Sequence, residues 1–181
     1  MRDSRDSISI HRTGAPGGST GPTSILLKGQ KKPSHCTSDF LVTHGAAPGS
    51  DICMTENAHV TNVAWSAMAE SHCQGVRAMP FIKANPDWWV LEIFDGCGSH
   101  VNNLEALDVR EQRRIIAVKE EADSSHVNQA CNKHVARSDK AFLRECLSQM
   151  RQAKSLNKGV VTQWNLVHVV LATIGETKPE R

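Results

Sequence analysis

Residues 88–118 contain the pattern that most restricts how this chain can fold. Residues 88–94 read Trp-Trp-Val-Leu-Glu-Ile-Phe, a run whose length and composition are typical of a buried strand. Asn102 or Asn103 can cap a helix after it, and residues 115–118 then predict a second strand. A strand, a helix and a strand in this order predict a βαβ unit and therefore an α/β fold.

The loop that follows the first of these strands contains the candidate reactive residues. Asp95 comes directly after the strand, Gly96 and Gly98 follow it, and Ser99 and His100 come next. Open α/β sheets place their sites at the carboxyl ends of the strands. Glycines let the backbone and a phosphate approach a metal ion closely, and a carboxylate is a preferred ligand of hard cations. We therefore predict a metal-dependent reaction on phosphate, with Asp95 as the metal ligand.

The composition narrows the class of protein. The 181 residues are enough for one domain with a core, and no apolar run approaches 18 residues, so we expect no membrane partner. The N-terminus lacks an apolar signal-peptide segment. The six cysteines contain no C-x-x-C pair, which argues against a zinc ribbon and favours free thiols in a reducing compartment. We therefore expect a nuclear or otherwise intracellular location.

The chain divides into three parts by composition. Residues 1–21 are rich in Ser, Gly, Thr, Pro and Arg and predict a disordered lead-in without a strand. Residues 22–132 carry the strand and helix patterns of one domain. Residues 133–181 predict basic and amphipathic helices. The middle part is acidic and the last part is basic, an arrangement that suits a metal site acting on a polyanion but is also an ordinary solvated charge pattern.

Three further elements are expected before residue 88. Residues 24–28 predict a short strand, and residues 40–42 predict another. Apolar residues recur at helical spacing from Val60 to Met68, and Gly75 is expected to end that helix.

The C-terminal helices have two interpretations. The candidate nucleic-acid-binding residues are Lys133, Arg137, Lys140 and Arg144. The alternative is a solvated basic face around a buried apolar stripe. The last helix carries an apolar stripe of its own, formed by Val160, Trp164, Val167, Leu171 and Ile174.

Four segments in register resemble the DDE superfamily endonuclease domain, the catalytic part of pogo-, Tigger- and jerky-type transposases. Thr-Ser-Ile-Leu-Leu-Lys-Gly-Gln at 23–30 resembles the family's apolar strand that ends in Lys-Gly. Met-Thr-Glu-Asn-Ala at 54–58, followed by Trp65, resembles the opening of the next helix. Residues 90–100 resemble the strand, Asp, Gly and Ser-His signature, and residues 125–132 resemble the segment that ends in the last catalytic Asp.

The resemblance implies an RNase H-like fold, a mixed sheet flanked by helices, here incomplete at its N-terminus. It also implies a DNA partner and a site in which three carboxylates hold two Mg²⁺ or Mn²⁺ ions for phosphodiester cleavage. Asp95 matches the second carboxylate. The third position is occupied by Asn132, which has no charge, and we expect the first carboxylate and the family's helix-turn-helix region to be missing.

Other residues are considered as substitutes. Asp39, Asp51 and Asp123 are candidate replacement ligands, although each is more typical of a solvated loop. Glu92 precedes Asp95 by three residues, so a regular strand places the two on opposite faces, and we expect Glu92 to be half-exposed. His100 and His126 are candidates for contact with phosphate or metal, with loop or capping histidines as the alternative.

Four hypotheses follow. The first is a degenerate, transposase-derived domain that binds nucleic acid without catalysis. The second is an active endonuclease with substitute ligands or with a site completed by a partner chain. The third is a protein-interaction module that binds a partner through the amphipathic helices at 133–155 and 160–174. The fourth is a translated relic without a selected function.

Overall fold

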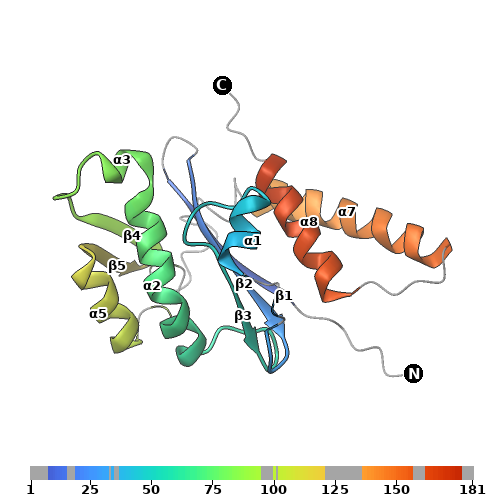
Figure 1. Cartoon of the computed structure of the whole chain (residues 1–181), viewed down its shortest axis with the longest axis horizontal. Helices are drawn as coiled ribbons and strands as arrows, with labels where there is room; N and C mark the ends of the chain where they lie inside the picture. Colours follow the sequence, from blue (N-terminus) through green and yellow to red (C-terminus); the bar gives the residue numbers. More distant parts are fainter. Residues whose placement is uncertain are drawn as a thin grey trace.

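A computed structural model describes residues 8–15, 19–32, 34, 37–94, 100, 102–120, 136–156 and 162–176 (Figure 1). Its strands are β1 (Ile8–Gly14), β2 (Thr20–Lys28), β3 (Asp51–Thr55), β4 (Val90–Phe94) and β5 (Ile115–Lys119). Its helices are α1 (Ser38–Thr43), α2 (Asn62–Ala78), α3 (Pro80–Lys83), α5 (Leu104–Gln112), α7 (Ala136–Leu156) and α8 (Gln163–Glu176). The described residues thus form an α/β fold, as the sequence predicts.

The strands form a mixed sheet and a separate parallel pair. In the mixed sheet β2 lies in the centre, antiparallel to β1 and parallel to β3. In the pair, β4 and β5 are parallel, with Val90 opposite Ile115 and Phe94 opposite Lys119. The helix α5 connects them, so the predicted βαβ unit at 88–118 is confirmed.

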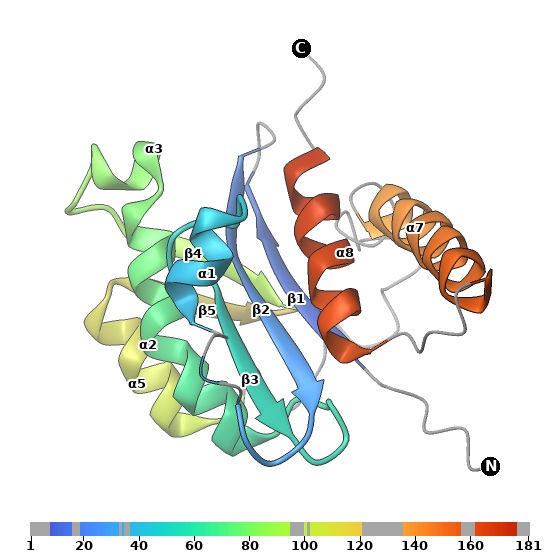
Figure 2. The ribbon, with the colours of Figure 1, turned by 45° about the vertical axis from the view of Figure 1, so that its right-hand side comes forward.

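Helices cover both faces of the mixed sheet (Figure 2). Leu26 of β2 packs against α2, where Trp65 and Met68 are buried with it. Its neighbours Ile25 and Leu27 point to the opposite face and pack with residues of α1 and α8. Alternate residues of one strand therefore supply two hydrophobic clusters, which explains why residues 21–27 are buried without interruption.

The parallel pair has one covered face and one exposed face. Val90 and Ile115 pack with Cys73 and Val76 of α2. On the other face, large apolar side chains of both strands remain in contact with solvent, with exposed fractions of 61% for Leu91, 60% for Ile93, 47% for Ile116 and 38% for Val118.

The N-terminal part differs from the expectation. Residues 8–14, assigned by composition to the lead-in, form β1 and pair with β2 from Ile8 opposite Leu27 to Gly14 opposite Thr20. The Ala15 amide donates to the Ser19 carbonyl at 2.9 Å, so the turn that joins the strands is closed by a backbone hydrogen bond. The prediction that no strand precedes residue 24 was wrong, because ladder pairing and burial against β2 outweigh a polar, glycine-rich composition.

Residues 40–42 lie in the helix α1 instead of a strand. Thr37 caps this helix, accepting a hydrogen bond at its side-chain oxygen from the Phe40 amide at 3.1 Å. Leu41 is fully buried against Ile25 and Ile52, so the apolar residues face the core from a helix. The side-chain cap that Thr37 supplies favours a helix over a strand for this short apolar run.

Gly75 lies inside α2 and does not end it. A Cβ atom at Gly75 would lie 2.2 Å from the Pro48 carbonyl oxygen and 2.8 Å from the Gly49 Cα. Gly49, in the turn before β3, has φ +83°. A Cβ atom at Gly49 would lie 2.4 Å from the Ser71 carbonyl oxygen and 2.6 Å from the Gly75 Cα. The missing side chain at Gly75 therefore allows the turn to pack directly against the helix backbone, which the sequence pattern could not reveal.

We predict that Gly75→Ala destabilises the protein, although alanine in an exposed helix would gain about 1 kcal/mol over glycine. The added methyl group meets backbone atoms of the 48–49 turn, which cannot move aside as a flexible side chain can. Thermal unfolding followed by circular dichroism measures the effect. Gly14→Ala is the matched control, because a Cβ at Gly14 has nothing within 4 Å. An unchanged or raised midpoint for Gly75→Ala would contradict the close packing.

Candidate functional site

The carboxyl ends of β4 and β5 form the edge at which the candidate site lies. Pairing continues to the last residue of β4, because the Glu120 amide donates to the Phe94 carbonyl at 2.9 Å. Asp95 is the next residue in the chain, so its predicted position directly after the strand is confirmed, although Asp95 itself and residues 96–99 lie outside the described residues.

Asn103 fastens the helix α5 beside this edge. Its side-chain oxygen accepts hydrogen bonds from the Ala106 amide at 3.3 Å and from the Ser66 hydroxyl at 3.1 Å. Its side-chain nitrogen donates to the Asn62 carbonyl at 2.8 Å. Asn103 is thus the predicted cap of α5 and also ties that helix to the first turns of α2.

Glu92 of β4 is buried, with 8% of its surface exposed, so the expectation of a half-exposed strand residue was wrong. Its Oε1 accepts a hydrogen bond from His72 Nε2 of α2. Its Oε2 accepts from Arg110 Nε of α5 at 3.2 Å. Because both carboxylate oxygens are engaged by side chains of the protein, Glu92 acts as a structural anion and is a poor metal ligand.

Arg110 links this carboxylate to an aromatic cluster. Only 1% of the residue is exposed, and its Nη1 donates to the Ala106 carbonyl at 3.0 Å. Its guanidinium carbon lies 4.9 Å from the ring centroid of Trp65 and 5.0 Å from that of Phe94, both distances at which a cation is attracted to an aromatic face.

The environment of Glu92 holds its carboxyl in the charged form. Burial alone raises the pKa of Glu92, but the hydrogen bond and charge of His72 and the charge of Arg110 outweigh burial. The net result is a pKa below the ordinary value of a glutamate. The cluster of Glu92, His72 and Arg110 is therefore an ion-paired core that joins β4, α2 and α5.

His100 lies within the same aromatic cluster. It is 4% exposed, and its ring centroid is 4.3 Å from that of Trp65, 5.5 Å from that of Phe94 and 5.2 Å from that of His11. His100 therefore packs into the interior between β1, α2 and β4. Its burial limits contact with a bulky phosphate substrate.

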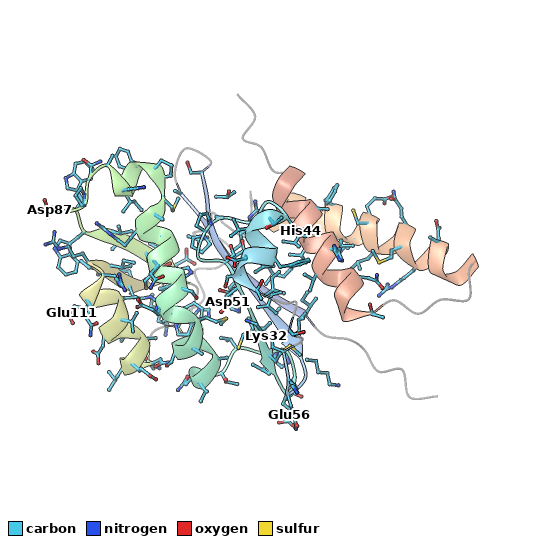
Figure 3. All side chains as sticks on the ribbon, viewed as in Figure 1. Lys32, His44, Asp51, Glu56, Asp87 and Glu111 are labelled. Atoms are coloured by element: carbon cyan, nitrogen blue, oxygen red, sulfur yellow. The ribbon has the colours of Figure 1, made fainter. Side chains whose placement is uncertain are left out.

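Two of the three candidate substitute carboxylates, Asp39 and Asp51, lie within the described residues. Asp51 at the start of β3 is paired with Lys32 at 3.0 Å, and its side chain also accepts a hydrogen bond from the Ile52 amide at 2.7 Å (Figure 3). Asp39 is exposed in the first turn of α1. Asp123, His126, Asn132 and Lys133 lie outside the described residues. Within the described part of the chain, no three His, Cys, Asp or Glu side chains lie close enough to hold a metal ion.

Three of the four candidate nucleic-acid-binding residues lie on α7, and the fourth, Lys133, lies outside the described residues. Arg137 and Lys140 are in the helix, with side chains outside the described set, and Arg144 and Arg151 are exposed. At 100° per residue, positions 137, 140, 144 and 151 fall on one face. Leu143, which lies about 90° around the helix from the centre of this face, packs against the cluster that contains Ile25.

His72 and Arg110 are not among the residues that the sequence pattern predicts for this site. Neither stands in a recognisable motif, and they contact Glu92 from 20 and 18 residues away. A charged residue at an inward position of an apolar strand is the only available signal, because such a residue needs a buried partner.

Comparisons with protein-family models, with curated proteins and with solved structures find no match to this chain. In the part of the chain that the structure describes, no helix is long and apolar enough to cross a membrane.

We predict that Glu92→Gln destabilises the protein by about 3–5 kcal/mol at neutral pH, because it leaves Arg110 buried without its counter-ion. The pKa of Glu92 is lowered on folding, so the carboxylate stabilises the fold above its ordinary pKa of about 4.3 and loses this effect as pH falls through the lower value. The difference between wild type and variant should therefore shrink below about pH 4.

Chemical denaturation at several pH values measures this difference. The exposed residue Glu111 provides a control variant, Glu111→Gln, whose unfolding midpoint should stay near that of the wild type (Figure 3). A pH-independent difference for Glu92→Gln would show that the charge of Glu92 is not the cause.

Proposed function

We propose that this protein is a DDE endonuclease-derived domain that binds DNA and has lost the ability to cleave it. The parallel unit β4–α5–β5, with Asp95 directly after β4, is the observation that carries the proposal. A site at the carboxyl edge of parallel strands is the expected place for a catalytic carboxylate in an open α/β sheet.

The arrangement of strands and helices supports an RNase H-like fold as the finer description. The structure combines an antiparallel pair, β1 and β2, with parallel pairing of β4 and β5. Helices lie on both faces of the mixed sheet. These features agree with a mixed sheet flanked by helices, the architecture that the resemblance implies.

We expect impaired catalysis because too few carboxylates are available to hold two metal ions. Two-metal cleavage needs clustered anionic oxygen ligands. Glu92 is committed to His72 and Arg110, and Asp51 to Lys32. Asn132 at the third position supplies an amide oxygen without charge. These residues do not fit a two-metal site, so no catalytic step is assigned.

The basic face of α7 is the proposed DNA contact. Arg144 and Arg151 are exposed on it, and Lys140 and Arg137 share the same face by helical spacing. Regularly spaced cations on one helix face suit the phosphates of a duplex, since each contact releases counter-ions. A DNA partner implies a nuclear location or another compartment that contains DNA.

Part of the surface that a protein partner would need, the apolar side of α8, is buried within the protein itself. Val167, Val170 and Leu171 of α8 are buried in the cluster that also contains Ile25 and Leu27 of β2. This apolar stripe therefore covers the protein's own sheet, which favours the DNA proposal over docking of a partner on α8.

We predict that the double variant Arg144→Glu/Arg151→Glu binds duplex DNA at least tenfold more weakly than the wild type and with a shallower dependence on salt. Fluorescence anisotropy with a labelled duplex at several salt concentrations measures both quantities. Lys31→Glu, which reverses an exposed charge outside α7, is the control and should retain most of the affinity. Equal losses of DNA affinity in the double variant and in Lys31→Glu would show that overall charge, and not the α7 face, governs binding.

We also predict that purified protein leaves supercoiled plasmid intact with Mg²⁺ or Mn²⁺, because loss of carboxylate ligands removes orders of magnitude in rate. Gel electrophoresis measures nicking over time, with Asp95→Ala as the comparison. Metal-dependent nicking by the wild type that disappears in Asp95→Ala would support the alternative of an active endonuclease with substitute ligands or a partner chain.

A further inference from the structure

We propose that Phe81 and Trp88 form a stacking platform for the bases of single-stranded nucleic acid, at the end of β4 opposite Asp95. The proposal deepens the proposed function, because it rests on a nucleic-acid partner, but it concerns a different surface from α7.

The two rings form an exposed pair. Phe81 of α3 is 70% exposed and Trp88 is 56% exposed. Their ring centroids are 5.6 Å apart and their planes meet at 71°, an edge-to-face contact. The pair therefore presents aromatic surface to solvent in a defined arrangement.

Hydrogen bonds hold the backbone that carries these rings. Arg77 of α2 donates from Nη1 to the Trp88 carbonyl at 2.9 Å and from Nη2 to the Pro86 carbonyl. The Trp88 amide donates to the Asn85 carbonyl at 3.1 Å, and the Asn85 side chain donates to the Phe81 carbonyl at 2.9 Å. Both ring-bearing residues are thus fixed through Asn85, which lowers the ordering cost of binding a ligand.

The charge around the rings favours an anionic ligand. Lys83 of α3 is exposed beside the rings, and Arg77 adds a positive charge while it holds the Pro86 and Trp88 carbonyls. The neighbouring acid, Asp87, is paired with Arg114 at 2.8 Å and lies at the outer edge of this region (Figure 3). Cations beside exposed rings are the combination that single-strand binders use, with phosphates on the cations and bases on the rings.

A single strand fits this surface better than a duplex does. Bases within a duplex are already stacked on each other, whereas those of a single strand can be splayed onto side chains. The α7 face and the ring pair therefore call for different forms of nucleic acid, which makes their contributions separable.

The test is a titration of the full chain with oligo-dT, followed by tryptophan fluorescence. We expect quenching in the wild type, and about tenfold weaker binding with most of the quenching lost in Trp88→Ala. Trp89→Ala is the matched control, because Trp89 is similarly exposed, at 54%, and adjacent, but is not part of the ring pair. It should keep both affinity and quenching. Phe81→Ala should weaken binding in the same direction as Trp88→Ala and serves if Trp88→Ala does not fold.

Two further arms identify the ligand chemistry. An abasic oligomer of equal length should bind more weakly than oligo-dT and without quenching. Vesicles of anionic lipid should not quench the wild type at the same ionic strength. Equal binding of the abasic oligomer, quenching by vesicles alone, or no difference between Trp88→Ala and Trp89→Ala would each overturn the platform.

Failure of this inference and failure of the proposed function are distinguishable. Duplex binding that depends on Arg144 and Arg151, with oligo-dT binding unaffected by Trp88→Ala, would retain the α7 interface and reject the platform. Quenching by oligo-dT that depends on Trp88, without duplex binding through α7, would retain the platform and reject that interface.

Discussion

The buried carboxylate of Glu92 is the interaction on which the arrangement around β4 depends. It is contacted by His72 of α2 through one oxygen and by Arg110 of α5 through the other. A buried anion is costly unless every oxygen is paired, so the strand and both helices must occupy their places together. Replacing all the partners by apolar residues can be tolerated in such clusters, but removing one leaves the others uncompensated.

The aromatic cluster extends this constraint to the mixed sheet. The Arg110 guanidinium lies over Trp65 and Phe94, and His100 stacks near the same rings. His11 of β1 joins this cluster through contacts with both His100 and Trp65. Among the described residues, the strand end that precedes Asp95 therefore rests on a packed interior in which these charges and rings hold the elements together.

Sequence patterns predicted correctly those elements whose conformation depends mainly on residues close together in the chain. The parallel unit, the Asn103 cap and the last amphipathic helix were all predicted, because each depends on spacing or capping within a few residues. Prediction failed where distant contacts decide. Glu92 is buried by partners about 20 residues away, and Gly75 is accommodated inside a helix by the 48–49 turn.

The sequence by itself determined the α/β class and the position of Asp95 after a strand, since strand length, caps and polar loops are encoded locally. Only the tertiary structure decided which charges are available for function. Glu92 and Asp51 are neutralised by partners, whereas Arg144 and Arg151 stay exposed. Pairing depends on which residues the fold brings within a few ångströms, and no local pattern carries that information.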